Sequence, residues 1–262
     1  MERIPRCHAQ SYRDEKMKEP RSYGWKNVIY QSREELPSDV KTFDNPEWVE
    51  KQNNRIRNMI ISERELLIQR NKILIQYVNS IKKENVTVLD YGGSLGTSYL
   101  PLKDNNSGKK LNYHVVEVPG MVKTANKVFV SDSCINFSST IPEDLDQVDI
   151  VYIRTSLQYS EDWRKTLQSL FNIGATYFIL AHVSAGDIPT YLTLQLWGSY
   201  EIPYWFINKN ELKQVANQNQ YNCVDDHVCY DMTTDAGWET YKHFPHRYRL
   251  QELSNIIFKK DF

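Results

Sequence analysis

The feature that most constrains the fold is an apolar segment that runs directly into a glycine-rich turn, at residues 86–100. Val86, Val88 and Leu89 form a short β-rich run, and such a run predicts a buried strand. Asp90 ends this strand, and three glycines follow within six residues: Gly92, Gly93 and Gly96. Glycine keeps side chains out of the turn, so a ligand can approach the backbone N–H groups that open the next helix. The order strand, turn, helix therefore predicts a nucleotide-type pocket.

Several interpretations of this stretch are open. Gly92 to Gly96 spells G-x-S-x-G, which in an α/β-hydrolase carries a nucleophilic serine, here Ser94. A dinucleotide-binding turn fits less well, because Ser94 occupies the second glycine position of G-x-G-x-x-G. The spacing Asp90-x-Gly92-Gly93-x-x-Gly96 resembles the first motif of class I S-adenosylmethionine-dependent methyltransferases. The structural alternative is a glycine turn that binds no ligand.

Glu117 discriminates between these interpretations. It ends the second predicted strand about twenty residues after the turn, where a nucleotide-binding α/β fold places a carboxylate for the ribose hydroxyls. A carboxylate at this position has no role in an α/β-hydrolase. The nucleophile turn of a hydrolase also normally follows several strands and an oxyanion loop, which residues 1–85 do not offer. Asp90 disfavours a dinucleotide, because its charge would repel a pyrophosphate, whereas a sulfonium–ammonium cofactor prefers that charge. The alternative for Glu117 is a solvated strand end.

Charge and composition exclude several classes of protein. The 262 residues carry 32 basic and 33 acidic side chains, a net charge of −1, which gives no electrostatic footprint for a nucleic-acid partner. No apolar run is long enough to cross a bilayer, so we expect a soluble cytoplasmic protein without a membrane span. The four cysteines form no C-x-x-C pair, which disfavours a disulfide framework and a metal site.

Strands and helices alternate through the central part of the chain. This alternation favours an α/β fold with a doubly wound, mainly parallel, seven-stranded sheet. A helix is expected over residues 160–171, after the fourth strand. The predicted strands cover residues 86–91, 113–118, 135–138, 148–154, 177–183, 222–230 and 254–259.

Two segments lie outside this alternation. Residues 1–85 mix charge, proline and aromatic side chains, and we interpret them as an irregular and helical cap on the domain formed by residues 86–262. Within the cap, Asn45 and Pro46 are typical of a helix start, and one or two amphipathic helices follow up to residue 82. The second segment is an insertion at about residues 184–215, which we expect to form a loop and a helix.

Further segments narrow the resemblance. From Gly24 to the C-terminus the chain resembles a family of methyltransferases associated with bacterial surface polysaccharide gene clusters, of the O-antigen or capsule type. The segments that carry this likeness are Asp149-Ile150-Val151, Ser156-Leu157-Gln158-Tyr159 and the run EIPYWFIN at residues 201–208. The resemblance implies S-adenosyl-L-methionine as cofactor and a small-molecule or glycan acceptor that carries a sugar hydroxyl.

The resemblance also implies roles for particular residues. Glu117 would bind the ribose and Ser138 the adenine rim. The methionine half of the cofactor would be lined by Asp90, Gly92, Gly93, Gly96, Thr155 and Ser156. Ser94, within the turn, is a further cofactor-binding candidate. Two positions depart from the common pattern: Ser94 replaces a small glycine, and Ser138 stands where an adenine-contacting acid is common.

Methyl transfer to a hydroxyl needs a base, because the pKa of an unactivated alcohol lies far above neutral. His182 closes the fifth predicted strand, and the carboxyl ends of parallel strands face the ligand crevice. A histidine with a near-neutral pKa suits this task, although a packed core histidine is the equal alternative. Tyr159 and Asp187 are reserve candidates, with a core aromatic and a loop cap as their alternatives.

The aromatic run YEIPYWF at residues 200–206 is interrupted by proline, so we expect a wall of the acceptor pocket rather than a strand. Its alternative is a docking surface for the N-terminal helices or for a second copy in a homodimer. The sequence thus predicts an S-adenosylmethionine-dependent sugar O-methyltransferase. An α/β-hydrolase that uses Ser94 and a non-catalytic binding module remain the alternatives.

Overall fold

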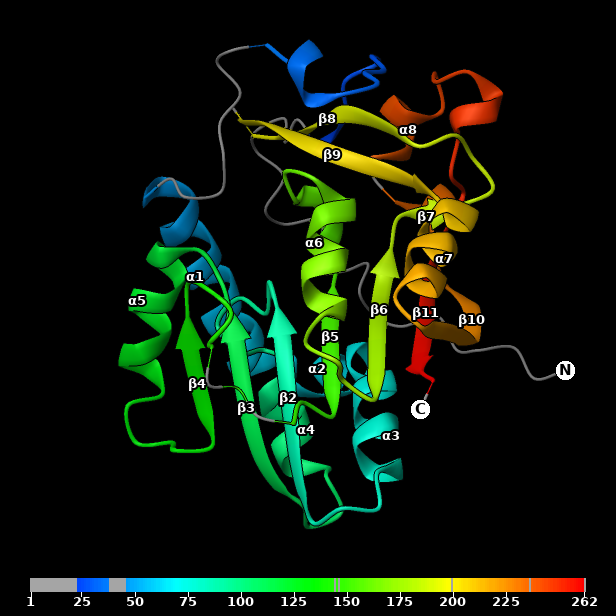
Figure 1. The fold of residues 1–262 in the computed structure, drawn as a ribbon. Helices are drawn as coiled ribbons and strands as arrows, with labels where there is room; N and C mark the ends of the chain where they lie inside the picture. The colour runs from blue at the N-terminus through cyan, green and yellow to red at the C-terminus, as the bar shows by residue number, and fades with distance from the viewer. Residues whose placement is uncertain are drawn as a thin grey trace, which may run out of the picture.

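The computed structural model describes residues 23–37, 46–143, 145, 147–198, 200–235 and 237–261. Figure 1 shows one large sheet with helices on both faces and a smaller sheet lying across its upper end. The predicted helix cap Asn45 lies outside the described residues. No helix in the described ranges is long and apolar enough to span a membrane.

The large sheet has seven strands, and the five neighbouring strands from β4 (Ile135–Ser138) to β6 (Tyr177–Val183) run parallel. The antiparallel strand β11 (Glu252–Lys260) lies between β6 and β10 (Tyr221–Asp231). This arrangement confirms the predicted doubly wound, mainly parallel sheet. In spatial order the strands are β4 (Ile135–Ser138), β3 (Lys110–Val116), β2 (Asn85–Tyr91), β5 (Ile150–Arg154), β6 (Tyr177–Val183), β11 (Glu252–Lys260) and β10 (Tyr221–Asp231).

Helices bury both faces of this sheet, which is why its central strands are apolar on both sides. On β2, Val88 belongs to a buried apolar cluster with side chains of α3 (Lys72–Ser80) and α4 (Tyr99–Asp104). Leu89 belongs to a second buried apolar cluster with side chains of α6 (Trp163–Phe171) and α7 (Lys209–Gln218). A third pair, α1 and α5, packs around Val49 and Met121 beside the glycine turn. The helices are α1 (Pro46–Ser62), α2 (Arg64–Arg70), α3 (Lys72–Ser80), α4 (Tyr99–Asp104), α5 (Pro119–Val128), α6 (Trp163–Phe171) and α7 (Lys209–Gln218).

The described segment from Pro46 to Ser80 forms three α-helices rather than the predicted one or two. The second break falls at Asn71, a buried residue between α2 and α3. Its side-chain Nδ2 donates to the Leu67 carbonyl at 2.8 Å, and its Oδ1 accepts from the Tyr152 hydroxyl at 3.2 Å. A side chain that hydrogen-bonds to local backbone competes with the helix, so Asn71 ends one helix and fixes the start of the next on the sheet.

The insertion differs from the prediction of a loop and a helix. Before α7 it forms an antiparallel hairpin of β8 (Tyr191–Trp197) and β9 (Tyr200–Asn208), to which β1 (Tyr23–Trp25) and β7 (Ala185–Gly186) add. The run YEIPYWF is therefore a strand, and the expectation that Pro203 excludes one was wrong. Pro203 faces Leu194 of β8, and β7 pairs with β9 only at Ile207 and Asn208. Pro203 thus sits where the other edge of β9 needs no hydrogen-bond donor.

An aromatic cluster joins the small sheet to the C-terminal part of the chain. The Trp25 ring lies 5.8 Å from Tyr204, 5.9 Å from Phe206 and 5.3 Å from Tyr241. The Trp25 backbone N–H also donates to the Thr240 hydroxyl at 2.8 Å. Short helical segments complete this region and the loops: η1 (Arg33–Glu35), η2 (Leu157–Tyr159), η3 (Met232–Thr234), α8 (Trp238–Tyr241) and η4 (His246–Tyr248).

We predict that Trp25→Ala lowers the free energy of unfolding by about 3–5 kcal/mol, because the indole is 4% exposed and fills the aromatic cluster. Chemical denaturation measures this change. Val130→Ala is the control, since Val130 is 82% exposed and its loss should cost no more than about 0.5 kcal/mol. A loss below about 1 kcal/mol for Trp25→Ala would mean that β1 is not part of the folded core.

Candidate cofactor-binding site

The ends of three neighbouring parallel strands form the candidate site. Register pairs Tyr91 of β2 with Val116 of β3, and Asp90 with Tyr152 of β5. Glu117 follows β3 directly, so its carboxylate and that of Asp90 lie at the same edge of the sheet, as predicted. The glycine turn crosses this edge between them.

Asp90 is fully buried as the penultimate residue of β2. The Tyr113 hydroxyl donates to its Oδ2 at 2.7 Å, while its Oδ1 has no hydrogen-bond partner among the described residues. Burial raises the pKa of Asp90 to about 7, against the opposing hydrogen bond from Tyr113. The turn folds over this carboxylate, because a Cβ at Gly93 would lie 2.4 Å from Oδ2. Only glycine fits at position 93.

Ser156 holds the start of the turn. Its hydroxyl donates to the Tyr91 carbonyl at 2.7 Å. Gly92 has a left-handed φ of +74°, and a Cβ there would lie 2.3 Å from the Ser156 Cβ. The structure therefore places Ser156 behind the turn, whereas the resemblance implied that it lines the methionine half of the cofactor. Gly96 lies further along, packed under Ile135 and Phe137.

Glu117 anchors the other side of the turn. Its Oε1 accepts from the Ser94 backbone N–H at 3.2 Å, and its Oε2 accepts from the Val118 N–H at 2.7 Å. Burial raises the pKa of Glu117. Ser94 has a left-handed φ of 57°, which costs a non-glycine residue conformational energy and directs its N–H to the carboxylate. Each carboxylate oxygen retains capacity to accept a ligand hydroxyl.

A cavity of 170 Å³ opens between the turn and the N-terminal helices. Five predicted residues line it: Asp90, Gly92, Gly93, Ser94 and Thr155. Sequence reasoning missed the others, which are Gln52, Arg70, Thr97, Ser98 and Arg154. Arg154 ends the fourth predicted strand, so the sequence already indicated that it lies at the carboxyl edge of the sheet. Nothing in the local sequence placed Gln52 of α1 or Arg70 of α2 at this edge.

The remaining predicted cofactor residues lie nearby. Ser138 ends β4, beside Glu117, whose backbone N–H donates to the Ser138 carbonyl at 3.0 Å. The Ser138 hydroxyl is engaged with the Thr140 carbonyl at 2.6 Å. Thr155 has a left-handed φ of 52°, and its hydroxyl donates to the Arg154 carbonyl at 2.7 Å.

None of the three proposed bases lines this cavity. His182 lies at the end of β6 with a φ of 52°, and its backbone N–H donates to Asn255 Oδ1 at 3.1 Å. Burial, followed by the charges of Arg154 and Arg70, lowers the pKa of His182 to about 4, so the expected near-neutral pKa was wrong. The Tyr159 hydroxyl donates to Gln195 at 2.7 Å, and Asp187 is exposed beyond β7.

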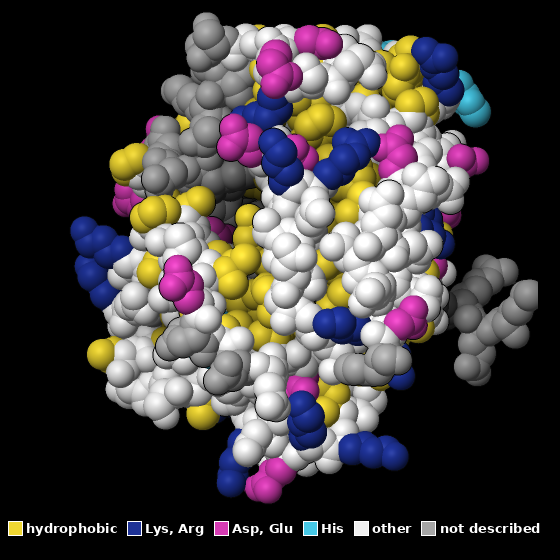
Figure 2. All heavy atoms as spheres, in the orientation of Figure 1, with side chains coloured by type: hydrophobic (Ala, Val, Ile, Leu, Met, Phe, Trp, Pro, Cys, Tyr) yellow, Lys and Arg dark blue, Asp and Glu magenta, His cyan; other side chains and the backbone are white. Residues whose placement is uncertain are grey.

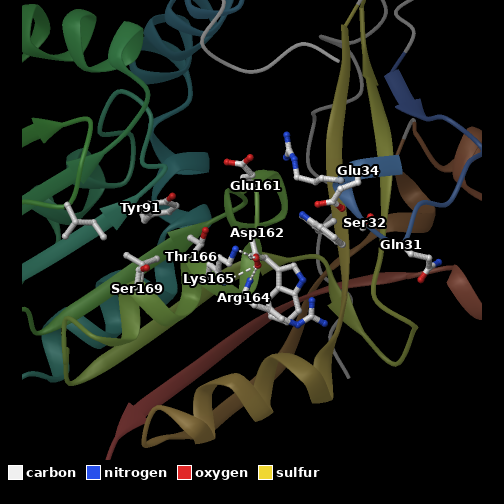
Figure 3. Close-up of a pocket in the computed structure, with 15 residues that line it drawn as sticks. Gln31, Ser32, Glu34, Tyr91, Glu161, Asp162, Arg164, Lys165, Thr166 and Ser169 are labelled. Carbon is white, nitrogen blue, oxygen red and sulfur yellow. Dashed lines mark hydrogen bonds and ion pairs between the residues drawn. The ribbon is translucent and has the colours of Figure 1, made fainter. Parts of the chain in front are cut away.

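A second, larger cavity of 630 Å³ lies beside α6 and is lined by Tyr91 (Figure 3). Tyr91, Thr166 and Ser169 lie on one side of it, and Gln31, Ser32 and Glu34 lie on the other. Trp205 of the small sheet and Trp163 of α6 also line it. The buried Trp163 indole N–H has no hydrogen-bond partner in the described part of the chain. Figure 2 shows acidic and basic side chains interspersed on this face, without a region of one sign.

No protein-family model matches the chain, and no curated protein matches it. Solved structures do. The 1,6-didemethyltoxoflavin-N1-methyltransferase of Burkholderia thailandensis, with 1,6-didemethyltoxoflavin and S-adenosylhomocysteine bound, matches at a TM-score of 0.54 and 14% identity, over 86% of this chain and 94% of that chain. The magnesium protoporphyrin IX methyltransferase of Synechocystis PCC 6803, with bound S-adenosylhomocysteine, matches at 0.52 and 12% identity, over 84% and 96%.

A third match is a complex of the Haloferax volcanii Trm112 methyltransferase activator with a proposed methyltransferase, at a TM-score of 0.53 and 18% identity, over 84% of this chain and 96% of that chain. These likenesses, together with the strand order and the antiparallel β11, define the fold. It is the class I S-adenosylmethionine-dependent methyltransferase fold, as the glycine motif predicted.

We predict that Asp90→Asn stabilises the cofactor-free protein at pH 8. Because the folded pKa of about 7 exceeds the ordinary value of 3.8, the folded protein loses stability as pH rises between these values. At about 1.4 kcal/mol per pKa unit, the variant should be roughly 2–4 kcal/mol more stable than the wild type at pH 8 and little different at pH 4. Chemical denaturation at both pH values measures this. Asp187→Asn, at an exposed position, is the control; an equal effect of Asp90→Asn at the two pH values would contradict the argument.

Proposed function

We propose that the protein is an S-adenosylmethionine-dependent methyltransferase that binds its cofactor across the carboxyl edge of the large sheet. The observation that carries this proposal is the pair of strand-end carboxylates, Asp90 and Glu117, on either side of a glycine turn in a class I methyltransferase fold. The unpartnered Asp90 Oδ1 has the position and charge to accept from an ammonium group. The structures from Burkholderia and Synechocystis, which hold S-adenosylhomocysteine, support this choice of cofactor.

The dimensions of the site divide the cofactor between two regions. The 170 Å³ cavity suits the amino-acid end and not the whole molecule. The ribose hydroxyls would then donate to Glu117, and the adenine would lie toward Ser138 at the end of β4. S-adenosylmethionine supplies an electrophilic methyl group. The residues of this chain would hold it near Tyr91 and Gly92, since Tyr91 lines the larger cavity and Gly92 lines the smaller one.

We propose that the acceptor is a sugar hydroxyl, on a free, nucleotide-linked or polymeric sugar, and that it binds in the 630 Å³ cavity. Two aromatic side chains, Tyr91 and Trp205, line it and offer apolar surface to a sugar ring, whereas Trp163 is fully buried with the Arg164 guanidinium 4.3 Å from its ring centroid. Glu34 and Glu161 add acceptors for the sugar hydroxyls. The resemblance of the sequence to polysaccharide-cluster methyltransferases motivates this choice, and we propose on that basis that the reaction belongs to bacterial surface polysaccharide synthesis.

The three expected bases, His182, Asp187 and Tyr159, line neither cavity. We keep His182 as the proposed base, with Asp187 and Tyr159 in reserve, because the charges of Arg154 and Arg70, which line the small cavity, act on its imidazole. Its low pKa leaves the imidazole neutral throughout the physiological range and available to accept a proton. It is a weaker base than a near-neutral histidine, so its contribution falls toward the lower end of the usual range.

The alternatives predict different observations. A hydrolase needs a histidine beside Ser94, and none of the described residues that line its cavity is a histidine. A serine-reactive fluorophosphonate would label Ser94 in a hydrolase and would leave a methyltransferase unlabelled. A non-catalytic binding module would bind S-adenosylhomocysteine without turnover.

We predict that Glu117→Ala weakens binding of S-adenosylmethionine by about 1.5–3 kcal/mol, because it removes a charged acceptor from the ribose hydroxyls. Isothermal calorimetry on the folded variant measures this. Glu84→Ala is the matched control, since its side chain is exposed just before β2, at the opposite end of the sheet. Unchanged affinity in Glu117→Ala would reject this placement of the ribose.

We predict that labelled S-adenosylmethionine transfers its methyl group to a member of a nucleotide-sugar panel, detected by mass spectrometry. On that acceptor, His182→Ala should lower kcat by about 10²-fold and leave cofactor affinity nearly unchanged. Since the pKa of His182 is about 4, its protonation should not change the wild-type kcat between pH 6 and pH 8. Wild-type turnover by a folded His182→Ala protein would move the base elsewhere.

A further inference from the structure

One edge of the large sheet is a long strand that is paired on one side only within the described chain. β10 spans 11 residues at the outer edge of the sheet (Figure 1), and β11 is the only described strand that pairs with it. The strand at the opposite edge, β4, has only 4 residues. Val224 and Val228 on β10 are 50% and 52% exposed. An edge strand presents unpaired backbone N–H and C=O groups, so β10 can pair with a further strand.

The middle of β10 pairs regularly with β11. Register shifts interrupt the pairing on either side, between Cys223 and Asp225 and between Val228 and Tyr230. From Asp225 to Val228 the pairs are consecutive, so successive side chains point to opposite faces of the sheet. A further strand at this edge must match that alternation, because a shift of one residue exchanges the two faces.

The charged side chains of this stretch divide between the two faces. Asp225 and His227 share one face, and the Asp225 Oδ1 and His227 Nδ1 atoms lie 3.2 Å apart. Asp226 points to the other face, where its carboxylate accepts from the Lys209 ammonium at 2.9 Å and from the Lys213 ammonium at 2.8 Å. The charge of Asp226 is thus compensated from α7, whereas the Asp225 and His227 side chains are 41% and 44% exposed.

A second copy of this chain fits these conditions. Two β10 strands related by a twofold axis perpendicular to the sheet run antiparallel, and residues opposite each other then share a face. With the axis at Asp226, Asp225 of each copy lies opposite His227 of the other copy, so the same pair of groups meets twice. The two Asp226 carboxylates also meet, but each has two lysines beside it.

Other registers fit less well. An axis at Asp225 would set two carboxylates opposite each other, and an axis at His227 would set two imidazoles opposite each other. The axis at Asp226 also brings Val224 of each copy to the level of Val228 of the other, so the exposed apolar side chains of the two strands come together. Charge and apolar pattern therefore select the same register.

We propose that two copies of this chain pair through β10, in the register centred on Asp226, and form a dimer with one continuous sheet. This pairing does not depend on the proposed reaction. A chain of hydrogen bonds runs inward from the interface: His227 Nε2 lies 3.1 Å from Asn255 Nδ2, and Asn255 Oδ1 accepts from the His182 backbone N–H at 3.1 Å. The interface thus lies next to the support of the strand end that carries His182.

Sedimentation velocity on the full chain, across micromolar to submillimolar concentrations, tests this pairing. The wild type should show a monomer–dimer equilibrium that stops at the dimer, because a twofold contact is closed. His227→Asp sets carboxylates opposite each other twice and should raise the dimer dissociation constant about tenfold or more. Asp225→Lys combined with His227→Asp restores opposite charges across the axis and should return the constant to within about threefold of the wild type. His246→Asp, the same change at an exposed histidine of η4, is the matched control.

Hydrogen exchange on the wild type gives a second measurement, which needs no variant. The backbone amides of residues 225–228 should become more protected as the concentration rises through the dimer equilibrium. Protection that is already complete in the monomer would mean that another part of this chain covers the edge, and it would overturn the proposal.

The other outcomes also decide the question. A wild type that stays monomeric throughout overturns the proposal. Assemblies that keep growing with concentration indicate an open contact, such as β10 against β4 of the next copy, and overturn the twofold pairing. A dimer that a folded His227→Asp protein retains at wild-type strength lies on another surface. Failure of the folded double variant to regain the dimer assigns the effect of His227→Asp to its own chain and overturns the register.

Discussion

The site depends on a carboxylate that the fold buries without fully pairing it. Asp90 is the penultimate residue of β2, where it is fully buried and accepts a hydrogen bond from the Tyr113 hydroxyl at 2.7 Å. A buried carboxylate that is not fully hydrogen-bonded lowers the stability of the folded protein, and such groups are found where a ligand can pair with them. The surrounding turn is shaped by it: Gly93 leaves room for the carboxylate, and Ser156 fixes the backbone at Gly92. The burial of Asp90, the conformation of the glycine turn and the shape of the candidate site therefore depend on one another.

The parts added to the sheet have separate tasks. The N-terminal helices bring Gln52 and Arg70 to the side of the turn that holds the small cavity. The hairpin of β8 and β9 brings Trp205 to the other side, next to the segment that contains Glu34. The two additions thus supply part of the lining of the two cavities at the carboxyl edge of the large sheet.

Much of this arrangement was predictable from local patterns. The apolar runs and the glycine turn placed Asp90 and Glu117 at neighbouring strand ends, because register in a parallel sheet aligns those ends. Long-range packing decided what the sequence missed. Asn71 breaks a helix through a contact with Tyr152, 81 residues away. Pro203 is compatible with β9 only because no strand pairs beside it there, and the low pKa of His182 comes from burial and from arginines on other elements. Such effects have no signature in a short window of sequence.

The pairing of β1 with β8 has a consequence for solubility. β8 reads YLTLQLW, an uncharged, β-prone run, and β9 covers one of its edges. Three residues near the start of the described chain and a bridge from Tyr30 to Leu192 cover the other. If they detached, β8 would present an open edge of unpaired backbone groups to other molecules, the geometry from which intermolecular β-stacking begins. The short strand at residues 23–25 therefore protects this edge of β8 from intermolecular pairing, although it is only three residues long.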